Sequence, residues 1–305
     1  MKPANKIPAN KKINFIHIIF LMILLITPVS CSKKPENNVN SLEASMKTNT
    51  GDPAITSAGE TKDQKEDFIE DFWSETFSKA GLPDFLKNKI LSYLLQGPDF
   101  AMELFSLMDA DPYLTLLVDK QHALDGNYVP NDLIELTELT ELTDNAYRVS
   151  RAGLMLRRAA AESLQRMAEA AKDDGVILEA ASAYRSFDYQ AEVYSRNVRE
   201  LGQQAADRES AKPGHSQHQL GLVIDFYPID DMFAETPASR WLRKNAAQFG
   251  WSLSYPEGFE EITGYRHESW HYRYLGIDLA NFTEKYFDGI QQYALLFIFA
   301  WKNFQ

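Results

Sequence analysis

Four of the six histidines in this chain of 305 residues fall in two short clusters that also contain carboxylates. The first cluster has the sequence Pro-Gly-His-Ser-Gln-His-Gln-Leu-Gly-Leu-Val-Ile-Asp, and the second has the sequence Gly-Tyr-Arg-His-Glu-Ser-Trp-His-Tyr-Arg-Tyr. Their histidines and carboxylates are His215, His218, Asp225, His267, Glu268 and His271. Imidazoles with a carboxylate are typical zinc ligands, and three protein ligands leave a fourth position open, as a catalytic site requires. The chain has a single cysteine, Cys31, so it forms no internal disulfide and offers no thiolate to either cluster.

The second cluster contains the sequence His-Glu-x-x-His, which binds zinc in zincin-type endoproteases when both histidines share one face of a helix. Here the aromatic residues around the second histidine favour a strand, and Gly264 and Gly276 leave little room for a long helix. We therefore expect the match to be accidental. A zincin-like endoprotease that uses His267 and His271 is the alternative, and it predicts that replacing His218 leaves zinc binding intact.

The apolar pattern predicts the elements that would position these side chains. The expected helices and strands are helices at 148–172, 188–201 and 241–249, and strands at 114–118, 176–183, 222–227 and 270–274. In this scheme Asp225 and His271 lie in strands, and Arg185 lies between a strand and a helix. Helices and strands that mix without strict alternation favour an α+β fold over a parallel α/β sheet.

Two further segments flank the expected catalytic domain at residues 113–280. Residues 65–112 carry aromatic and aliphatic side chains at helical spacing, broken at Gly-Leu-Pro and Gly-Pro, which predicts a helical accessory region. Residues 281–305 predict one C-terminal helix, capped by Asn281 with Glu284 three residues later. Its apolar side chains fall on one stripe, so we expect it to dock on the domain.

The first residues of the sequence predict that the protein is exported from the cytoplasm. Four lysines precede a largely apolar run at residues 15–26, and Thr-Pro-Val-Ser then leads into Cys31. The run is too short to span a bilayer and fits the apolar part of a secretory signal peptide. The segment resembles a bacterial lipoprotein signal, apart from Pro28 where that family usually has leucine, so we expect residues 1–30 to be removed and Cys31 to carry a lipid that anchors the protein to a membrane. An ordinary cleaved signal peptide or an uncleaved anchor is the alternative. Residues 31–64 are almost free of large apolar side chains and predict a flexible tether.

The overall charge excludes one large class of partners. The chain carries 31 Lys and Arg against 43 Asp and Glu, a net charge of −12. Such an acidic surface repels phosphate backbones, so we expect no nucleic-acid partner. The composition leaves the oligomeric state open.

Five sequence blocks between residues 116 and 276 resemble, in the same order, those of the VanY-type zinc carboxypeptidases. That family contains the D-alanyl-D-alanine and L,D-carboxypeptidases of peptidoglycan metabolism. The blocks are Val-Asp-Lys-Gln-His-Ala-Leu-Asp, Tyr-Val-Pro-Asn-Asp-Leu, Ser-Ala-Tyr-Arg-Ser, Gly-His-Ser-Gln-His-Gln-Leu-Gly and Glu-Ser-Trp-His-Tyr-Arg-Tyr. Their number and order make the resemblance specific. The departures, Ala183 where glycine is usual and Val223 where a small residue is common, affect no ligand.

The resemblance implies a hedgehog/DD-peptidase α+β fold in which a small antiparallel sheet carries the metal site. The implied Zn²⁺ ligands are His218, Asp225 and His271, and the implied catalytic base is Glu268. The implied substrate-binding residues are Arg185, Gln190 and Ser216. Arg185 suits the C-terminal carboxylate of a peptide because a guanidinium can pair with it bidentately.

The sequence therefore predicts a lipid-anchored zinc carboxypeptidase that removes the C-terminal D-alanine from peptidoglycan stem peptides. The tether would let an enzyme held at a membrane reach the wall. A non-catalytic wall-binding lipoprotein of the same fold is the alternative. That alternative predicts a missing ligand or base, and the sequence lacks neither.

Overall fold

The computed structural model describes residues 62–142 and 146–304. The predicted signal peptide and Cys31 lie outside the described residues, and so does most of the predicted tether. The last three residues assigned to the tether belong instead to helix α2 (Lys62–Lys79). In the described part of the chain, no helix combines the length and the apolar character needed to cross a bilayer.

A five-stranded sheet lies at the centre of the domain predicted at residues 113–280. Its strands, in spatial order, are β2 (Tyr147–Val149), β4 (Leu178–Ser182), β5 (Val223–Phe226), β7 (His271–Tyr274) and β6 (Trp251–Leu253). All neighbours are antiparallel except β2 and β4, which pair in parallel. A separate antiparallel pair joins β1 (Leu133–Glu135) and β3 (Met155–Arg157). These small sheets mixed with helices confirm the α+β fold, although one edge of the main sheet is parallel where we predicted antiparallel pairing.

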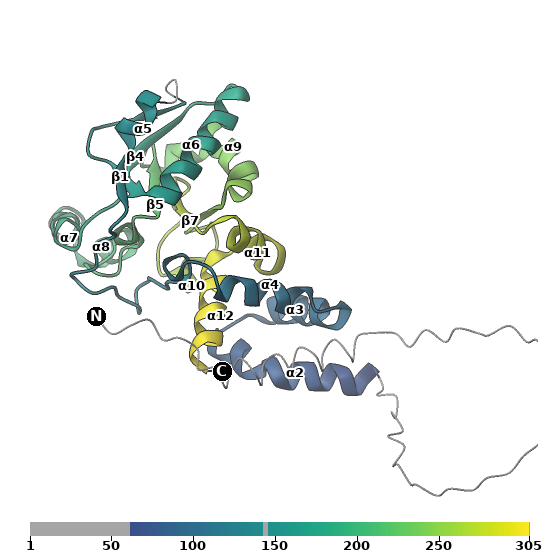
Figure 1. Cartoon of the computed structure of the whole chain (residues 1–305). Coiled ribbons are helices and arrows are strands. Elements are labelled where there is room, and N and C mark those ends of the chain that lie inside the picture. The colour runs from purple at the N-terminus through teal and green to yellow at the C-terminus, as the bar shows by residue number, and fades with distance from the viewer. Residues whose placement is uncertain (1–61, 143–145, 305) are drawn as a thin grey trace, which may run out of the picture.

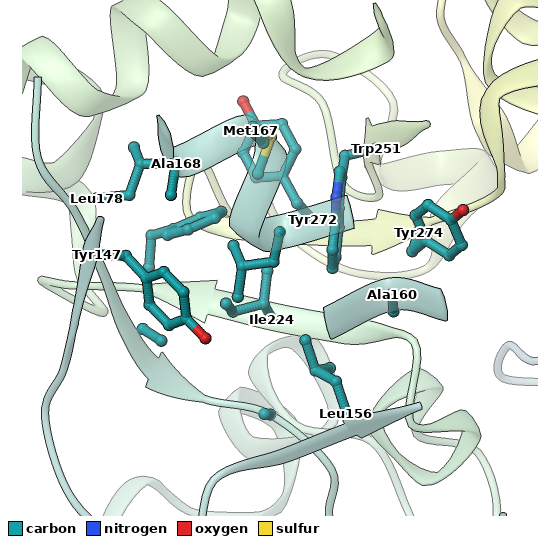
Figure 2. Close-up of a cluster of buried hydrophobic side chains, with 14 of the residues drawn as sticks. Tyr147, Leu156, Ala160, Met167, Ala168, Leu178, Ile224, Trp251, Tyr272 and Tyr274 are labelled. Atoms are coloured by element: carbon teal, nitrogen blue, oxygen red, sulfur yellow. The ribbon is translucent and has the colours of Figure 1, made fainter. Parts of the chain in front are cut away.

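Helix α6 (Arg158–Asp173) and the sheet build the first hydrophobic core. Figure 2 shows Met167 of α6 close to Ile224 of β5 and Tyr272 of β7. Successive side chains of a strand point to opposite faces. The even-numbered residues of β5 and β7 therefore face this core, and the odd-numbered residues Asp225 and His271 face the other side of the sheet.

A second core joins the helices at the two ends of the described chain. It contains α2, α3 (Asp84–Gln96), α4 (Asp99–Met108), α11 (Ile277–Phe287) and α12 (Gln291–Phe304). The fully buried indole of Trp73 stacks on Trp301, with ring centroids 4.7 Å apart, and on Phe297. The predicted accessory region and the predicted C-terminal helix thus form one helical subdomain, which lies at one end of the molecule (Figure 1).

The C-terminal segment is two helices rather than the single helix that we predicted. The first begins at Ile277, after Gly276, so Asn281 lies inside it and the predicted cap is wrong. Helix α11 ends where Asp288 and Gly289 adopt φ values of 52° and 76°, a left-handed conformation that a continuing helix excludes. The apolar stripe continues on α12 because both helices bury side chains in the same core.

Two further predictions are wrong in part. The helix predicted at 148–172 starts only at Arg158, because β2, a turn at Gly153 with φ +78° and β3 come first. The strand predicted at 114–118 is instead a 3-10 helix, η1 (Pro112–Thr115), followed by extended chain. The carbonyls of Leu114 and Leu116 accept hydrogen bonds from Arg273 Nη2, at 3.1 and 2.8 Å, so a side chain takes the place of a partner strand.

The other predicted elements are confirmed, with shifted ends. The remaining helices and 3-10 helices are α5 (Leu136–Leu142), α7 (Phe187–Leu201), α8 (Gln203–Glu209), η2 (Gln217–Leu220), η3 (Asp231–Glu235), α9 (Pro237–Asn245), η4 (Ala246–Phe249) and α10 (Glu260–Thr263). The helix predicted at 188–201 is α7, and the helix predicted at 241–249 is α9 with η4. Figure 1 shows α7 and α8 side by side and apart from α6.

The junction between the two cores requires a glycine at position 250. Gly250 has φ +83°, and a Cβ there would lie 2.7 Å from the carbonyl carbon of Gly276 and 2.9 Å from the nitrogen of Ile277. The Gly250 carbonyl also accepts a hydrogen bond from Leu275 N at 2.8 Å. The chain that leaves β7 for α11 therefore passes directly against this glycine.

We expect Gly250→Ala to lower the free energy of unfolding by about 3 kcal/mol, because the clash is with backbone that cannot rotate away. Gly258→Ala is the matched control, since Gly258 has φ +85° and a Cβ there would meet no atom within 4 Å. It should cost only about 1 kcal/mol of left-handed strain. Urea titrations followed by circular dichroism measure both values, and equal losses would show that the close approach at Gly250 is unimportant.

Candidate metal centre and active site

Three buried side chains converge at the middle of the sheet, on the face opposite the α6 core. Asp225 of β5 pairs in register with His271 of β7, and His218 comes from η2, just before β5. One potential ligand atom from each lies within 4.8 Å of the other two. Asp225 Oδ2 is 3.1 Å from His218 Nε2, and Asp225 Oδ1 is 3.1 Å from His271 Nδ1. The structure therefore brings together the three residues that the sequence predicts as metal ligands.

A tight turn at Gly221 brings His218 to this position. Gly221 ends η2 with φ +69°, and its N–H donates to the His218 carbonyl at 3.1 Å. A Cβ at Gly221 would lie 2.9 Å from Leu133 Cδ2. Glycine lets the chain turn from η2 into β5 while packing closely against β1.

Backbone and side-chain carbonyls fix which nitrogen of each imidazole faces the site. His218 Nδ1 lies 2.6 Å from the Ala183 carbonyl, which can only accept, so Nδ1 carries the proton and Nε2 faces Asp225. His271 is turned the other way, with Nε2 3.3 Å from Gln217 Oε1. Its Nε2–H donates to that oxygen, so Nδ1 faces Asp225. Both rings thus offer one nitrogen to a common point, as metal-ligating histidines do.

The donor set fits a zinc ion. His218 Nε2 and Asp225 Oδ1 are buried, and their neighbours at 3.1 Å within the trio give neither of them a well-formed hydrogen bond among the described residues. Leaving such a group unsatisfied costs roughly 1–3 kcal/mol, more for a charged group. A divalent cation would satisfy both atoms at once. Two imidazoles and a carboxylate supply three ligands and leave the fourth tetrahedral position open.

Burial and neighbouring charges set the protonation of the trio. Burial, together with the charge of Arg185, lowers the pKa of His218 to about 4. Burial also acts to lower the pKa of His271, but contacts with Asp225 and Glu268 outweigh it and raise that pKa to about 9. Desolvation acts to raise the pKa of Asp225, yet the two imidazoles hold it well below its ordinary value. A cation at His271 Nδ1 must therefore displace a proton.

Glu268 lies next to the trio without belonging to it. Its Oε2 is 3.3 Å from His271 Nδ1, and only 8% of the residue is exposed. The turn before β7 holds it, because Glu268 N donates to the Tyr255 carbonyl at 3.1 Å and His271 N donates to the Glu268 carbonyl at 3.2 Å. A carboxylate at this place can exchange a proton with a water molecule bound at the open position.

Arg185 brings a positive charge to the same site. It follows β4, its backbone N–H donates to the His218 carbonyl at 3.3 Å, and its Nη2 lies 3.8 Å from Asp225 Oδ2. Burial lowers its pKa, although nearby Asp225 and Glu268 act to raise it. Its buried Nε makes no hydrogen bond within the described chain. The guanidinium therefore keeps donors available for a carboxylate ligand.

These side chains line one open cavity of about 400 Å³. Gln190 and Ser216 line it as well, both buried. The Gln190 amide is held by a 2.7 Å bond from Nε2 to the Ala211 carbonyl, and its Oε1 has no hydrogen-bond partner among the described residues. The seven predicted metal-binding, catalytic and substrate-binding residues thus share one cavity, of the size that small ligands occupy.

The cavity also contains residues that sequence reasoning missed. Its wall includes Tyr255, whose ring centroid is 4.7 Å from that of His271, and two exposed arginines, Arg151 and Arg196. Gln217, the acceptor for His271, was missed too, although it adjoins a predicted ligand in the first cluster. In the sequence, these residues are marked only by lying near one of the two clusters or within a predicted helix. Many other polar residues do the same, so the signal does not single them out.

The two remaining cluster histidines point elsewhere. His215 Nδ1 lies 2.8 Å from the Asp119 carbonyl, and His267 Nδ1 lies 2.9 Å from the Tyr255 carbonyl. His267 precedes β7 in a segment without helical structure. The His-Glu-x-x-His sequence is therefore not helical, as expected, and the zincin alternative finds no support in this geometry.

Comparison with known proteins identifies the catalytic domain. Residues 153–277 match the family model described as VanY, D-alanyl-D-alanine carboxypeptidase. A D-alanyl-D-alanine carboxypeptidase of Enterococcus faecalis (strain ATCC 700802 / V583) is 38% identical over 136 residues, which cover 42% of this chain and 50% of that relative. The chain spans 50 to 59% of the length of the curated relatives that it matches.

Two solved structures are similar to the chain as well. The LD-carboxypeptidase LdcB is 34% identical, with 57% of this chain and 85% of that chain covered and a TM-score of 0.49. A variant of the vancomycin-resistance D,D-pentapeptidase VanY, solved in complex with Zn(II), is 31% identical. The match covers 59% of this chain and 98% of that chain, with a TM-score of 0.47. The residues that match the family model, 153–277, include both strands of the trio, and this part of the chain belongs to the VanY family of D-alanyl-D-alanine carboxypeptidases.

Proposed function

We propose that the protein is a zinc-dependent carboxypeptidase that removes the C-terminal D-alanine from peptidoglycan stem peptides. One observation carries the proposal. The convergent trio of His218, Asp225 and His271 has the carboxylate of Glu268 beside it and the guanidinium of Arg185 within the same cavity. The relatives support the proposal, since the similar VanY structure contains Zn(II) and the similar enterococcal protein is a D-alanyl-D-alanine carboxypeptidase.

The residues divide the reaction between them. Zinc, when bound, supplies a Lewis acid that polarises the scissile carbonyl and lowers the pKa of water. Glu268 would accept a proton from the attacking water as the water oxygen bonds to the carbonyl carbon, and would then deliver that proton to the departing nitrogen as the C–N bond breaks, which leaves a shortened peptide carboxylate and a free amine. His218, Asp225 and His271 would hold the ion. The carbonyl of Ala183 and the amide of Gln217 keep the two imidazoles in the required tautomers.

Arg185 explains why the proposed enzyme would cleave the last peptide bond of its substrate. Its guanidinium, close to the trio, can pair with the terminal carboxylate and so place the last peptide bond over the ion. An internal peptide bond has no such carboxylate. The site is therefore suited to removing one residue rather than to cutting within a chain.

The alternative of a non-catalytic wall-binding protein receives no support from the geometry. A protein that kept the fold and lost the reaction would be expected to lack a ligand or the base. Here the trio, Glu268 and Arg185 are all present, buried or half-buried, and face one cavity.

A digest of purified stem peptides tests the activity and its specificity together. We expect the protein to release one D-alanine, and we expect a chelator to abolish the release and added Zn²⁺ to restore it. Pentapeptide stems test D,D-cleavage, and tetrapeptide stems test L,D-cleavage. The same peptides amidated at the C-terminus should resist, because Arg185 then lacks its carboxylate. Mass spectrometry of the products decides, and cleavage within the amidated peptides would contradict the assignment.

Glu268→Gln should bind Zn²⁺ normally and lose at least about 1000-fold in kcat, because the amide cannot accept the proton. Glu209→Gln is the matched control. Glu209 lines the same cavity, but its carboxylate lies 3.5 Å from Arg266 and is not among the described ion pairs of the trio. Metal content and kcat are measured on both variants. A Glu268→Gln enzyme with normal turnover would remove Glu268 from the mechanism.

We further propose that the protein is an extracytoplasmic lipoprotein anchored through Cys31, on the strength of the sequence around that residue. A lipid at this position would leave the catalytic domain at the end of a tether. Cys31→Ser should move the protein from the membrane fraction to the soluble fraction after cell lysis, as followed by immunoblotting. A variant that stays with the membrane would argue against a lipid at Cys31.

A further inference from the structure

A chain of buried hydrogen bonds connects the metal ligand His271 to the C-terminal helix α12. His271 Nε2 lies 3.3 Å from Gln217 Oε1, and Ser254 Oγ donates to the same oxygen at 2.8 Å. Gln291, the first residue of α12, then donates from Nε2 to Ser254 Oγ at 3.1 Å. Gln217, Ser254 and Gln291 are each no more than 2% exposed. Solvent therefore has little access to this chain of bonds.

The donors and acceptors permit only one direction for these bonds. The Gln291 amide has two hydrogens, and both are used, one on Ser254 Oγ and one on the Ser252 carbonyl at 3.1 Å. Ser254 Oγ accepts from Gln291, so its own hydrogen is free to point at Gln217 Oε1. Gln217 Oε1 therefore accepts from both Ser254 and His271. This arrangement keeps the proton of His271 on Nε2 and leaves Nδ1 for the cation.

Gln291 lies beyond the part of the chain that matches the family model, which ends at residue 277. We propose that Gln291 is a positioning residue for the metal site, so that the C-terminal helical subdomain completes the hydrogen bonding of a metal ligand. The inference rests on His271 as a ligand in the proposed function, and it does not depend on which peptide is the substrate.

The neighbouring residue shows what a purely structural contact of α12 looks like. Gln292 Nε2 donates to Asp119 Oδ2 at 2.8 Å, and Asp119 in turn binds His122. Gln292 is buried like Gln291 and anchors the same helix turn to the catalytic domain. Asp119 bonds to no member of the trio in the described structure. The two adjacent glutamines therefore separate anchoring of the helix from positioning of the ligand.

Zn²⁺ affinity of the full-length protein tests the proposal without any substrate. We expect Gln291→Met, which keeps length and removes both donors, to weaken Zn²⁺ binding on the order of tenfold in competition with a chromophoric chelator. Ser254→Ala should weaken it by a similar factor. The double variant should be no worse than either single variant, because all three break one chain of hydrogen bonds.

Gln292→Met is the matched control and should keep the wild-type Zn²⁺ affinity, although it should lower the melting temperature as Gln291→Met does. Equal losses of affinity in Gln291→Met and Gln292→Met would overturn the proposal, because they would mean that α12 acts on the site only through general stability. Wild-type affinity in Gln291→Met would overturn it as well. If Gln291→Met fails to fold, Ser254→Ala decides the question, because it leaves α12 unchanged. Wild-type Zn²⁺ affinity in Ser254→Ala would then overturn the proposal. Peptide hydrolysis is not measured, so a wrong substrate assignment would not affect the result.

Discussion

Burial of the Asp225 carboxylate between two imidazoles is the constraint around which the catalytic domain is built. An isolated carboxylate is very costly to bury, and it is tolerated only with charged or hydrogen-bonding partners. Here His218 and His271 each approach to 3.1 Å, and Arg185 lies at 3.8 Å. The site must therefore form as a unit, because loss of one partner leaves the others buried and unpaired.

The strand alternation explains how a charged site can share a sheet with a hydrophobic core. On β5 and β7, Ile224 and Tyr272 contribute to the α6 core, while Asp225 and His271 occupy the opposite face. A slip of one residue in the register would move the carboxylate into the apolar core. The packing against α6 therefore stabilises the one register in which Asp225 and His271 pair. The same sheet also supplies the Ala183 carbonyl, just after β4, that orients His218.

The parts of this arrangement that could be predicted from the sequence are those whose signals are local. His218 and Asp225 lie in one short cluster, and Glu268 and His271 lie in another, so their residue types and spacing already indicate the chemistry. The break at Asp288 escaped prediction because the apolar stripe continues on both sides of it, in one shared core. The strands before α6 escaped for a related reason. They are only three residues long, and their pairing partners lie far away in the sequence.

Long-range polar contacts are the least predictable part, and they determine how the two cores fit together. Apolar packing alone, as around Trp73 and Trp301, is non-directional and tolerates sliding of one helix over another. Buried polar groups tolerate no such freedom, because each displaced donor or acceptor loses its partner. Gln291 and Gln292 place such groups at the first turn of α12, one toward Ser254 and the other toward Asp119. The register of the helix is therefore set by two contacts, and the one made by Gln291 extends through Ser254 and Gln217 to His271. The orientation of the His271 ring is consequently a property of both cores and not of the family domain alone.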